Sequence, residues 1–291
     1  MTRIADLLAA GPTFSFEFFP PRNDVEQATL VATLRDLEPL APAFVSVTYR
    51  GGRSSRERTH DLVAGMLKTT SLTPMAHLTC SVHSRLELAE ILVDLRKAGV
   101  ENLLALGGDS PSGDEAVHAE LHHAIELVEL ARAIGGFSIG VAAHPELHPG
   151  SAGDRDSDRG HLVAKMALAD FAVTQFFFRL EDYTTLVAEL AERGMTKPVL
   201  PGLMPITSLA GIKRMAELSG TEVPPEVVAR IEAVADDPAA LRAVGIELAT
   251  QLAADLLDAG APGLHFYTLN RSSATREIYR GLGLGVRPRA D

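Results

Sequence analysis

Residues 74–106, PMAHLTCSVHSRLELAEILVDLRKAGVENLLAL, contain the pattern on which the prediction of the fold rests. The segment opens with a short apolar run at 74–80 and closes with another at 102–106. Between them, apolar residues recur with the spacing of one helix face, at Leu88, Ile91, Leu92 and Leu95. Ser84 stands where the N-cap of that helix is expected. Because parallel strands need a crossover connection, this strand–helix–strand unit predicts two parallel strands.

The same unit recurs along the whole chain. Its short, mostly apolar runs span residues 14–19, 44–49, 74–80, 102–106, 138–143, 171–178, 198–203 and 263–269. Such runs are typical of strands buried on both faces. In a chain of 291 residues they favour an α/β fold with a closed eight-stranded (β/α)8 TIM barrel. An open doubly wound sheet is the alternative, but no run is followed by a GxGxxG loop. We predict one catalytic domain over residues 1–291, a loop at 150–160, and extra helices at 221–258 before the last strand.

The composition restricts the class of protein. With 46% hydrophobic and 22% charged residues, the chain is typical of a globular protein rather than a disordered one. The 27 basic and 38 acidic side chains give a net charge of −11, which argues against nucleic-acid or anionic-membrane partners. The single cysteine, Cys80, cannot form an intramolecular disulfide, and no apolar run reaches the ~18 residues of a membrane helix. We therefore expect a cytoplasmic protein, and the sequence is compatible with a homo-oligomer.

Polar residues at the ends of the runs are the candidates for an active site, because TIM barrels place it at the carboxyl ends of their strands. Glu17 lies among aromatic residues in the first run. It is interpreted either as a solvent-facing glutamate or as a desolvated general acid, since apolar surroundings favour a protonated carboxyl group. Asp109 follows two glycines after the fourth run, and is either a turn cap or a group close to a ligand.

Two more polar residues extend this set. Gln175 lies inside an apolar run and needs a hydrogen-bonding partner, which a bound ligand would supply. Arg271 follows the last run, and its guanidinium suits a carboxylate or a phosphate. The histidines and glutamate within 144–148 lack the spacing of metal ligands, so we expect no metal. An acid, a second carboxylate, an amide and an arginine suit proton delivery combined with hydride transfer. A lyase barrel is a weaker alternative, because no run contains a lysine.

Several uncommon strings occur in a fixed order along the chain. They are SFEFFPP at 15–21, SVTY at 46–49, RTH at 58–60, HLTC at 77–80, TQFFF at 174–178 and HFYTLNR at 265–271. Together they resemble methylenetetrahydrofolate reductase of the bacterial type over nearly the whole chain. The resemblance implies reduction of 5,10-methylenetetrahydrofolate to 5-methyltetrahydrofolate by NADH or NADPH, usually through FAD.

The resemblance also implies roles for individual residues. Glu17 is similar to the acid that protonates N10 of the folate, and Asp109 to the carboxylate that contacts the pterin and stabilises the developing cation. Gln175 resembles the amide shared by the pterin and the nicotinamide, and Arg271 falls where the family holds the glutamate tail of the folate. The implied cofactor contacts are Thr48, Tyr49, His77, His148, Asp158, Lys165 and Gln175.

The flavin contacts match the family less well than the folate contacts. The departures are Gly107 for an arginine, His144 for a tyrosine, Arg50-Gly51-Gly52 for a small pair, and His161 and Ala164 for an asparagine and an arginine. On the folate side, Gly211 and Met215 replace a glutamine and an aromatic residue. These changes predict weak or absent FAD binding and direct hydride transfer from the nicotinamide. The alternatives are an FAD-dependent ping-pong enzyme and an inactive folate-binding barrel.

Overall fold

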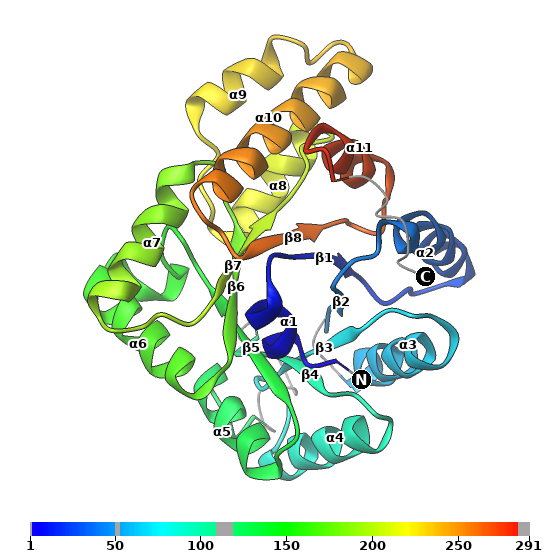
Figure 1. Ribbon diagram of the computed structural model, residues 1–291, viewed down its shortest axis with the longest axis vertical. Coiled ribbons are helices and arrows are strands. Elements are labelled where there is room, and N and C mark those ends of the chain that lie inside the picture. Colours follow the sequence, from blue (N-terminus) through cyan, green and yellow to red (C-terminus); the bar gives the residue numbers. More distant parts are fainter. Residues whose placement is uncertain (1, 50–52, 109–118, 285–291) are drawn as a thin grey trace.

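Eight parallel strands form a closed barrel, in which each strand pairs with the next along the chain and the last pairs with the first (Figure 1). The computed structural model describes residues 2–49, 53–108 and 119–284, with the backbone alone for 53–57. The strands are β1 (Thr13–Phe18), β2 (Phe44–Val47), β3 (Pro74–Thr79), β4 (Asn102–Leu106), β5 (Ser138–Ala143), β6 (Phe171–Phe176), β7 (Val199–Leu203) and β8 (Gly263–Tyr267). The predicted α/β TIM barrel is therefore confirmed.

Helices surround the barrel and fill the connections between its strands (Figure 1). They are α1 (Ile4–Ala10), α2 (Asp24–Leu37), α3 (Arg53–Thr69), α4 (Arg85–Lys97), α5 (Ala124–Ile134), α6 (Arg155–Leu168), α7 (Leu180–Glu192), α8 (Leu209–Ser219), α9 (Pro225–Glu232), α10 (Pro238–Asp258) and α11 (Ser273–Gly281), with short 3-10 turns η1 (Glu38–Leu40) and η3 (Pro149–Ser151). Ser84 caps α4 through the backbone N–H of Glu87, as predicted. The extra helices before the last strand are α9 and α10, which also confirms the prediction.

Two details of the sequence prediction are wrong. Several strands end one or two residues before the apolar runs do, because buried residues such as Tyr49 and Phe177 follow the last paired residue. The apolar composition of a run indicates which residues are buried, and the buried residues extend past the last residue that pairs with a neighbouring strand. The segment 150–160 is not simply a loop either. The side chain of Asp154 accepts from the N–H of Ser157 and starts α6, so that the second half of the segment is helical.

The amino-terminal end of the barrel is closed by α1, which lies across its opening (Figure 1). Ile4 and Leu8 of this helix belong to a buried apolar cluster with Phe44, Met75, Leu104, Phe171, Val173 and Leu200 from the strands. The backbone N–H of Ile4 donates to Asn102 Oδ1 at 2.8 Å, and that of Ala5 donates to Ser138 Oγ at 3.0 Å. One end of the barrel is thus filled by the chain itself, and any ligand has to enter at the carboxyl ends of the strands.

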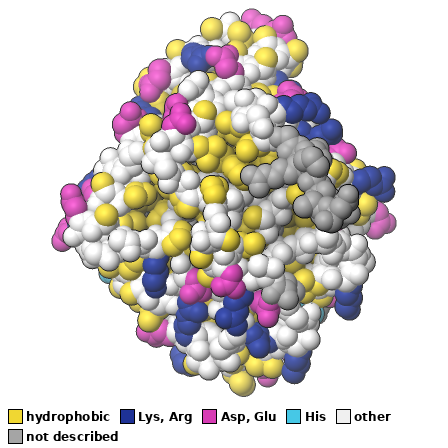
Figure 2. All heavy atoms as spheres, in the orientation of Figure 1, with side chains coloured by type: hydrophobic (Ala, Val, Ile, Leu, Met, Phe, Trp, Pro, Cys, Tyr) yellow, Lys and Arg dark blue, Asp and Glu magenta, His cyan; other side chains and the backbone are white. Residues whose placement is uncertain are grey.

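Figure 2 shows the face over α1, where the positive and negative side chains of the described residues are interspersed. Within the described ranges, none of the helices combines the length with the apolar character required to cross a bilayer.

Candidate active site

Glu17 points into the barrel at the carboxyl end of β1, and only 7% of it is exposed. In the sheet it is paired with Ser46 of β2 and Tyr267 of β8. Alternate residues of a strand face the same side, so Ser15 and Glu17 point inward, whereas Phe16 and Phe18 belong to the main core cluster. The interpretation of Glu17 as a solvent-facing glutamate is therefore wrong.

Three polar groups from three other strands surround one oxygen of this carboxyl group. Glu17 Oε2 lies 3.4 Å from Ser46 Oγ and 3.5 Å from both His77 Nε2 and His265 Nε2. We call these four residues (Glu17, Ser46, His77 and His265) the Glu17 cluster. The contacts are long for hydrogen bonds, as is common at catalytic groups before a ligand is bound.

His77 is held in its neutral form within this cluster. Burial lowers its pKa to about 4, and the neighbouring His265 lowers it further, while Glu17 acts in the opposite direction. Its Nε2 atom has no hydrogen-bond partner among the described residues. The buried hydroxyls of Thr48 and Thr79 also lack partners there. Buried polar atoms are normally satisfied, so this inner wall has the capacity to bind a polar ligand.

Tyr267 links the cluster to β6. Its hydroxyl donates to the carbonyl of Thr174 at 2.6 Å, and its ring lies edge-on to His265. Burial, with a smaller contribution from Glu17, raises the pKa of Tyr267 well above its ordinary value, so the phenol stays protonated. The next residue after Thr174 is Gln175, whose Oε1 accepts from the N–H of Phe176 at 3.0 Å. The amide oxygen therefore has a partner within the chain, contrary to the expectation that a ligand would supply it.

Gln175 lines a small cavity of about 10 Å³ together with residues from the loop after β5 and from the end of α8. Its neighbours there include His144, Glu146 and Thr221. Burial raises the pKa of Glu146, which accepts from the N–H of Glu222 at 2.8 Å. Gln175 thus lies at the boundary between the barrel interior and the β5–α6 region.

The turn after β8 is bound to the segment that contains Glu17. Thr268 Oγ1 donates to the carbonyl of Glu17 at 2.6 Å. Asn270 accepts from the N–H of Phe19 at 2.8 Å and donates to its carbonyl at 2.9 Å. Both Leu269 and Asn270 have positive φ angles, so the chain turns sharply here and leaves Arg271 exposed at the carboxyl-terminal side of the barrel.

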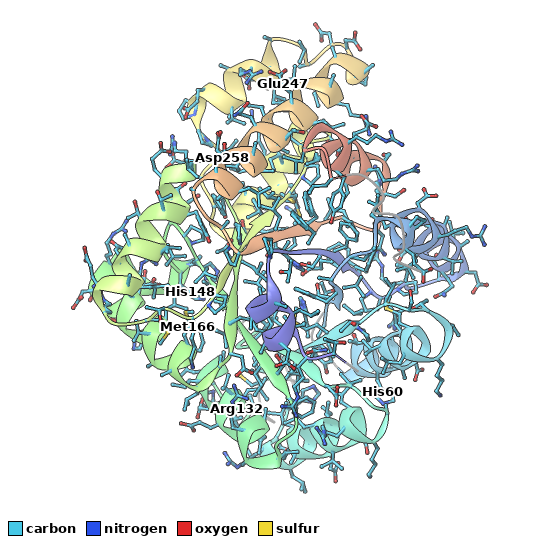
Figure 3. All side chains as sticks on the ribbon, viewed as in Figure 1. His60, Arg132, His148, Met166, Glu247 and Asp258 are labelled. Atoms are coloured by element: carbon cyan, nitrogen blue, oxygen red, sulfur yellow. The ribbon has the colours of Figure 1, made fainter. Side chains whose placement is uncertain are left out.

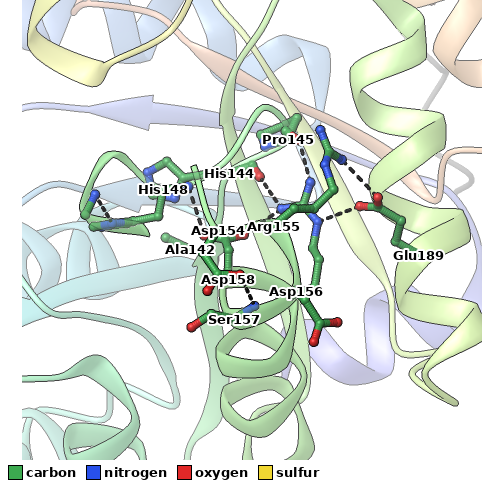
Figure 4. A network of polar contacts seen from close by, with 12 residues as sticks. Ala142, His144, Pro145, His148, Asp154, Arg155, Asp156, Ser157, Asp158 and Glu189 are labelled. Carbon is green, nitrogen blue, oxygen red and sulfur yellow. Dashed lines mark hydrogen bonds and ion pairs between the residues drawn. The ribbon is translucent and has the colours of Figure 1, made fainter. Parts of the chain in front are cut away.

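A second polar region lies outside the barrel wall, where the loop after β5 meets α6 (Figure 4). Arg159 is fully buried and donates to Glu189 at 2.7 Å, to Asp158 at 2.7 Å, and to the carbonyls of His144 and Pro145. We call Asp158, Arg159, Lys165 and Glu189 the α6 network. Figure 3 shows His148 and Met166 on the same side of the molecule.

The remaining predicted cofactor residues belong to this network or contact it. The backbone N–H of His148 donates to Asp158 at 2.9 Å, and the His148 ring lies edge-on to His144 at 4.7 Å. Lys165 Nζ donates to the carbonyl of Ala142 at 2.7 Å. Burial lowers the pKa of Lys165 to about 8 and that of His144 to about 4.

The structure brings some of the predicted site residues together and leaves others apart. Glu17 and His77 are in contact, whereas His148, Asp158 and Lys165 form the separate α6 network. Tyr49 is buried, and its hydroxyl lies 2.5 Å from His83 Nε2. Asp109 and Arg50 lie outside the described residues. Within those residues, no group of three or more His, Cys, Asp or Glu side chains is placed to hold a metal ion.

Sequence reasoning missed Ser15, Ser46, His265 and Tyr267, although all four lie in the strings that carried the resemblance. The signal that could have found them is strand alternation. Ser15 shares the face of Glu17, and His265 shares the face of Tyr267.

A family model for methylenetetrahydrofolate reductase matches residues 2–283. The chain belongs to the methylenetetrahydrofolate reductase family. It is 35% identical over 275 residues to the 5,10-methylenetetrahydrofolate reductase of Pectobacterium carotovorum, a match that covers 94% of this chain and 90% of that one. The Escherichia coli 5,10-methylenetetrahydrofolate reductase is 34% identical over 275 residues, which cover 94% of this chain and 91% of that one. A relative from Arabidopsis thaliana, methylenetetrahydrofolate reductase (NADH) 1, is 33% identical, and the chain covers 50% of its length.

Among solved structures, the chain has the fold of a Clostridium thermocellum protein described as binding two copies of 5-methyl-5,6,7,8-tetrahydrofolic acid. The TM-score is 0.63 at 11% identity, with 97% of this chain and 96% of that one covered. This likeness supports the barrel fold of the methylenetetrahydrofolate reductase family and nothing finer.

FAD is the cofactor that resemblance to the methylenetetrahydrofolate reductase family implies, so the α6 region has to be compared with what a flavin needs. A dinucleotide diphosphate needs cationic partners. In the described part of the chain, three cations of α6 already donate to a carboxylate or a carbonyl group. They are Arg155, Arg159 and Lys165. At Gly107, a Cβ atom would meet only the backbone nitrogen of Ala124, at 3.9 Å, so packing among the described residues does not require the glycine. Among the described residues, the cations of α6 are thus engaged within the chain and do not fit the diphosphate of a bound FAD.

Proposed function

We propose that this chain reduces 5,10-methylenetetrahydrofolate to 5-methyltetrahydrofolate with NADH or NADPH. The observation that carries the proposal is the position of Glu17. It is a nearly buried carboxyl group at the open end of the barrel, beside orphaned polar atoms of Thr48, His77 and Thr79. The names of the relatives and the folate bound by the Clostridium thermocellum protein support the same substrate class.

The first chemical step is the opening of the bridging ring of the substrate. Glu17 gives its proton to N10, the bond between N10 and the methylene carbon breaks, and an iminium forms at N5. A buried acid is required because N10 is a poor leaving group until it is protonated. Asp109, which the resemblance places next to the pterin, would stabilise this cation.

The other proposed contacts position the two substrates. Gln175 reaches the mouth of the barrel from β6, where its amide would contact both the pterin and the nicotinamide. Thr48 follows β2 and would contact the nicotinamide. Tyr49 is a further cofactor contact that the resemblance implies, and His77 on the next strand fits a position that holds FAD in the family. Arg271 is exposed beyond β8 and suits the carboxylates of the glutamate tail.

The second chemical step is hydride transfer, which we propose to be direct. The hydrogen at C4 of the reduced nicotinamide moves with its electron pair to the iminium carbon. The nicotinamide is thereby oxidised to NAD(P)⁺, and the carbon becomes the methyl group of 5-methyltetrahydrofolate. The closed α6 network supports this route, because its cations are engaged within the chain.

The test is an absorption spectrum of the purified protein combined with steady-state kinetics. We expect a protein without flavin absorbance that consumes NADH or NADPH only when 5,10-methylenetetrahydrofolate is present. Initial-rate plots should intersect, as they do for a ternary complex, and added FAD should leave the rate unchanged. A yellow protein with ping-pong kinetics would support the FAD-dependent alternative and end the direct route.

The same assay distinguishes the second alternative, an inactive folate-binding barrel. Such a protein would bind 5-methyltetrahydrofolate but would not turn over under any cofactor condition. The cytoplasmic location, the single domain, the lack of nucleic-acid partners, the homo-oligomer and the choice between NADH and NADPH stay predictions.

A further inference from the structure

His265 is a fully buried histidine in the interior of the barrel, next to β1. Its Nδ1 atom lies 2.7 Å from Ser15 Oγ. On the other side of the ring, Nε2 lies 3.3 Å from Ser46 Oγ and 3.5 Å from Glu17 Oε2. The ring also stacks on Phe44 at 5.9 Å. Polar and apolar contacts therefore fix both the position and the plane of this imidazole.

The contacts of Ser15 bear on which nitrogen of His265 carries the hydrogen. The Ser15 hydroxyl has two acceptors within reach, His265 Nδ1 at 2.7 Å and the carbonyl of Leu264 at 3.4 Å. We assign the hydroxyl hydrogen to the shorter of these contacts, the one to Nδ1. A neutral imidazole then carries its hydrogen on Nε2, which faces Ser46 and Glu17.

From this geometry we propose that His265, held by Ser15, is a positioning residue that orients the Glu17 carboxyl group and stabilises the carboxylate left after proton transfer. The inference rests on the proposed function of Glu17 as the acid. Because Oε2 is surrounded by Ser46, His77 and His265, Oε1 is left to face the ligand. An N–H directed at a carboxylate interacts with its charged form, so the His265 N–H would stabilise the carboxylate that proton transfer leaves on Glu17.

The other groups around Glu17 are uncharged or donate elsewhere, and what sets His265 apart from them is its 2.7 Å contact with Ser15. On β3, His77 is neutral, because burial lowers its pKa to about 4. On β2, Ser46 is uncharged, and on β8 the Tyr267 hydroxyl donates to Thr174 instead. Among the described residues, the histidines whose nitrogen atoms lie within 4.0 Å of a Glu17 carboxylate oxygen are His77 and His265. Asp109, outside the described residues, is left unchanged in every variant below.

The experiment compares two replacements of His265 in the full chain. His265→Asn keeps a polar atom near Ser15 but removes the Nε2 position, whereas His265→Gln restores a donor near that position. For His265→Asn we expect kcat to fall by about 10-fold to 100-fold, since small misplacements of a catalytic group have effects of this size. The KM for the folate should change by less than about threefold, because ground-state binding is retained. His265→Gln should recover part of kcat.

The pH profile separates positioning from a merely structural role. A general acid must be protonated to act, so kcat falls as the pH rises through the titration of that acid. Without the Nε2–H the Glu17 carboxylate is less stable, and the alkaline limb of the kcat profile should move to higher pH in His265→Asn. Ser15→Ala should move it in the same direction and lower kcat by about 3-fold to 10-fold, the effect of one hydrogen bond.

Ser138→Ala is the matched control for Ser15→Ala. Ser138 is also a buried serine at an inner position of the barrel, but it bonds to Ala5 at the opposite end. It should lower thermal stability without moving the pH limb. Binding of 5-methyltetrahydrofolate and circular dichroism report whether each variant is folded.

The outcomes separate the two proposals. If the wild-type chain does not reduce the folate, the proposed function fails. If the wild type is active and folded His265→Asn keeps its kcat and pH limb, the role of His265 is wrong. If His265→Asn does not fold, Ser15→Ala is the deciding variant. The inference is overturned if Ser15→Ala keeps the kcat and the alkaline limb of the wild type. It is also overturned if Ser138→Ala shows the same shift of that limb as Ser15→Ala.

Discussion

The Glu17 cluster and the α6 network are both buried polar regions, but their hydrogen bonding differs. In the Glu17 cluster, the contacts to Glu17 Oε2 are 3.4 to 3.5 Å long, and His77 Nε2 has no hydrogen-bond partner among the described residues. In the α6 network, Arg159 makes short contacts of 2.7 Å to two carboxylates. Unmet capacity in the first region is available to a ligand, whereas the second region is satisfied by the chain itself.

This difference bears on how the family chemistry is divided between the two regions. The resemblance assigns folate contacts mainly to the barrel interior and flavin contacts mainly to the α6 side. Among the described residues, the Glu17 cluster keeps unmet hydrogen-bonding capacity, whereas the α6 network contributes to packing and stability.

Replacing the acid should have the largest effect. Glu17→Gln keeps the size of the side chain but cannot supply a proton, so kcat should fall by about 100-fold to 10,000-fold. Binding of 5-methyltetrahydrofolate, measured by calorimetry, should persist. The control is Glu277→Gln, which removes a partly exposed ion pair with Arg242 and should leave kcat unchanged. Unchanged turnover in Glu17→Gln would show that Glu17 is not the acid and that the Glu17 cluster is not the catalytic region.

Breaking the α6 network should affect stability more than binding. Arg159→Met leaves Asp158 and Glu189 without their buried partner, and the free energy of unfolding should fall by about 3–5 kcal/mol. Urea denaturation measures this loss. Arg155→Met is the matched control, because Arg155 lies on the same helix and pairs with the same Glu189, but it is half exposed. Arg155→Met should lower the free energy of unfolding by less than about 1 kcal/mol. Equal losses in the two variants would show that the network is not a buried structural unit.

Acid should destabilise both regions through their neutral histidines. The pKa of His77 and that of His144 are each lowered from 6.5 to about 4 by burial. Between pH values of about 4 and 6.5, the unfolded chain therefore binds more protons than the folded one. The free energy of unfolding decreases as the pH falls through this range. For His77 the full loss is about 3 kcal/mol.

The check is the slope of the unfolding free energy against pH in this window. His77→Gln and His144→Gln should each reduce the proton uptake on unfolding by about one. Glu189 and Glu277 have pKa values lowered by their arginine partners, so their contributions are lost only at more acidic pH. A slope that neither variant changes would mean that the two histidines are protonated in the folded protein.

The fold was predictable because its signal is local and repeated. The predicted bounds of β4 and β5 agree with the structure, since each of these runs ends where polar or glycine residues begin. The ends of β2 and β6 were placed too late, because buried aromatic residues follow the paired ones. Periodicity reports which residues are buried, and it does not report which of them pair.

The site was predictable only in part. Glu17 could be found from its aromatic neighbours, but its contact with His265 depends on closure of the barrel between β1 and β8. Ser15 and His265 are 250 positions apart in the sequence, and no local pattern relates them. In the α6 network, Arg159 and Glu189 were missed for another reason. The acidic and glycine-rich segment before Arg159 is typical of a loop, although α6 starts within it.

The smallest expected effect comes from restoring one flavin contact, and it is the sharpest test of the comparison. Gly107→Arg introduces a cation where the family resemblance has one, and a charge-assisted hydrogen bond contributes about 1.5–3 kcal/mol, or about 10-fold to 100-fold in affinity. The cations of the α6 network would still donate to their own partners. We therefore expect no flavin absorbance in the purified variant and an unchanged rate with added FAD, with Gly107→Ala as the control for the backbone. If this single substitution produced a yellow protein, the α6 network could not be the barrier to flavin binding, and the two regions would differ by one side chain rather than by their hydrogen bonding.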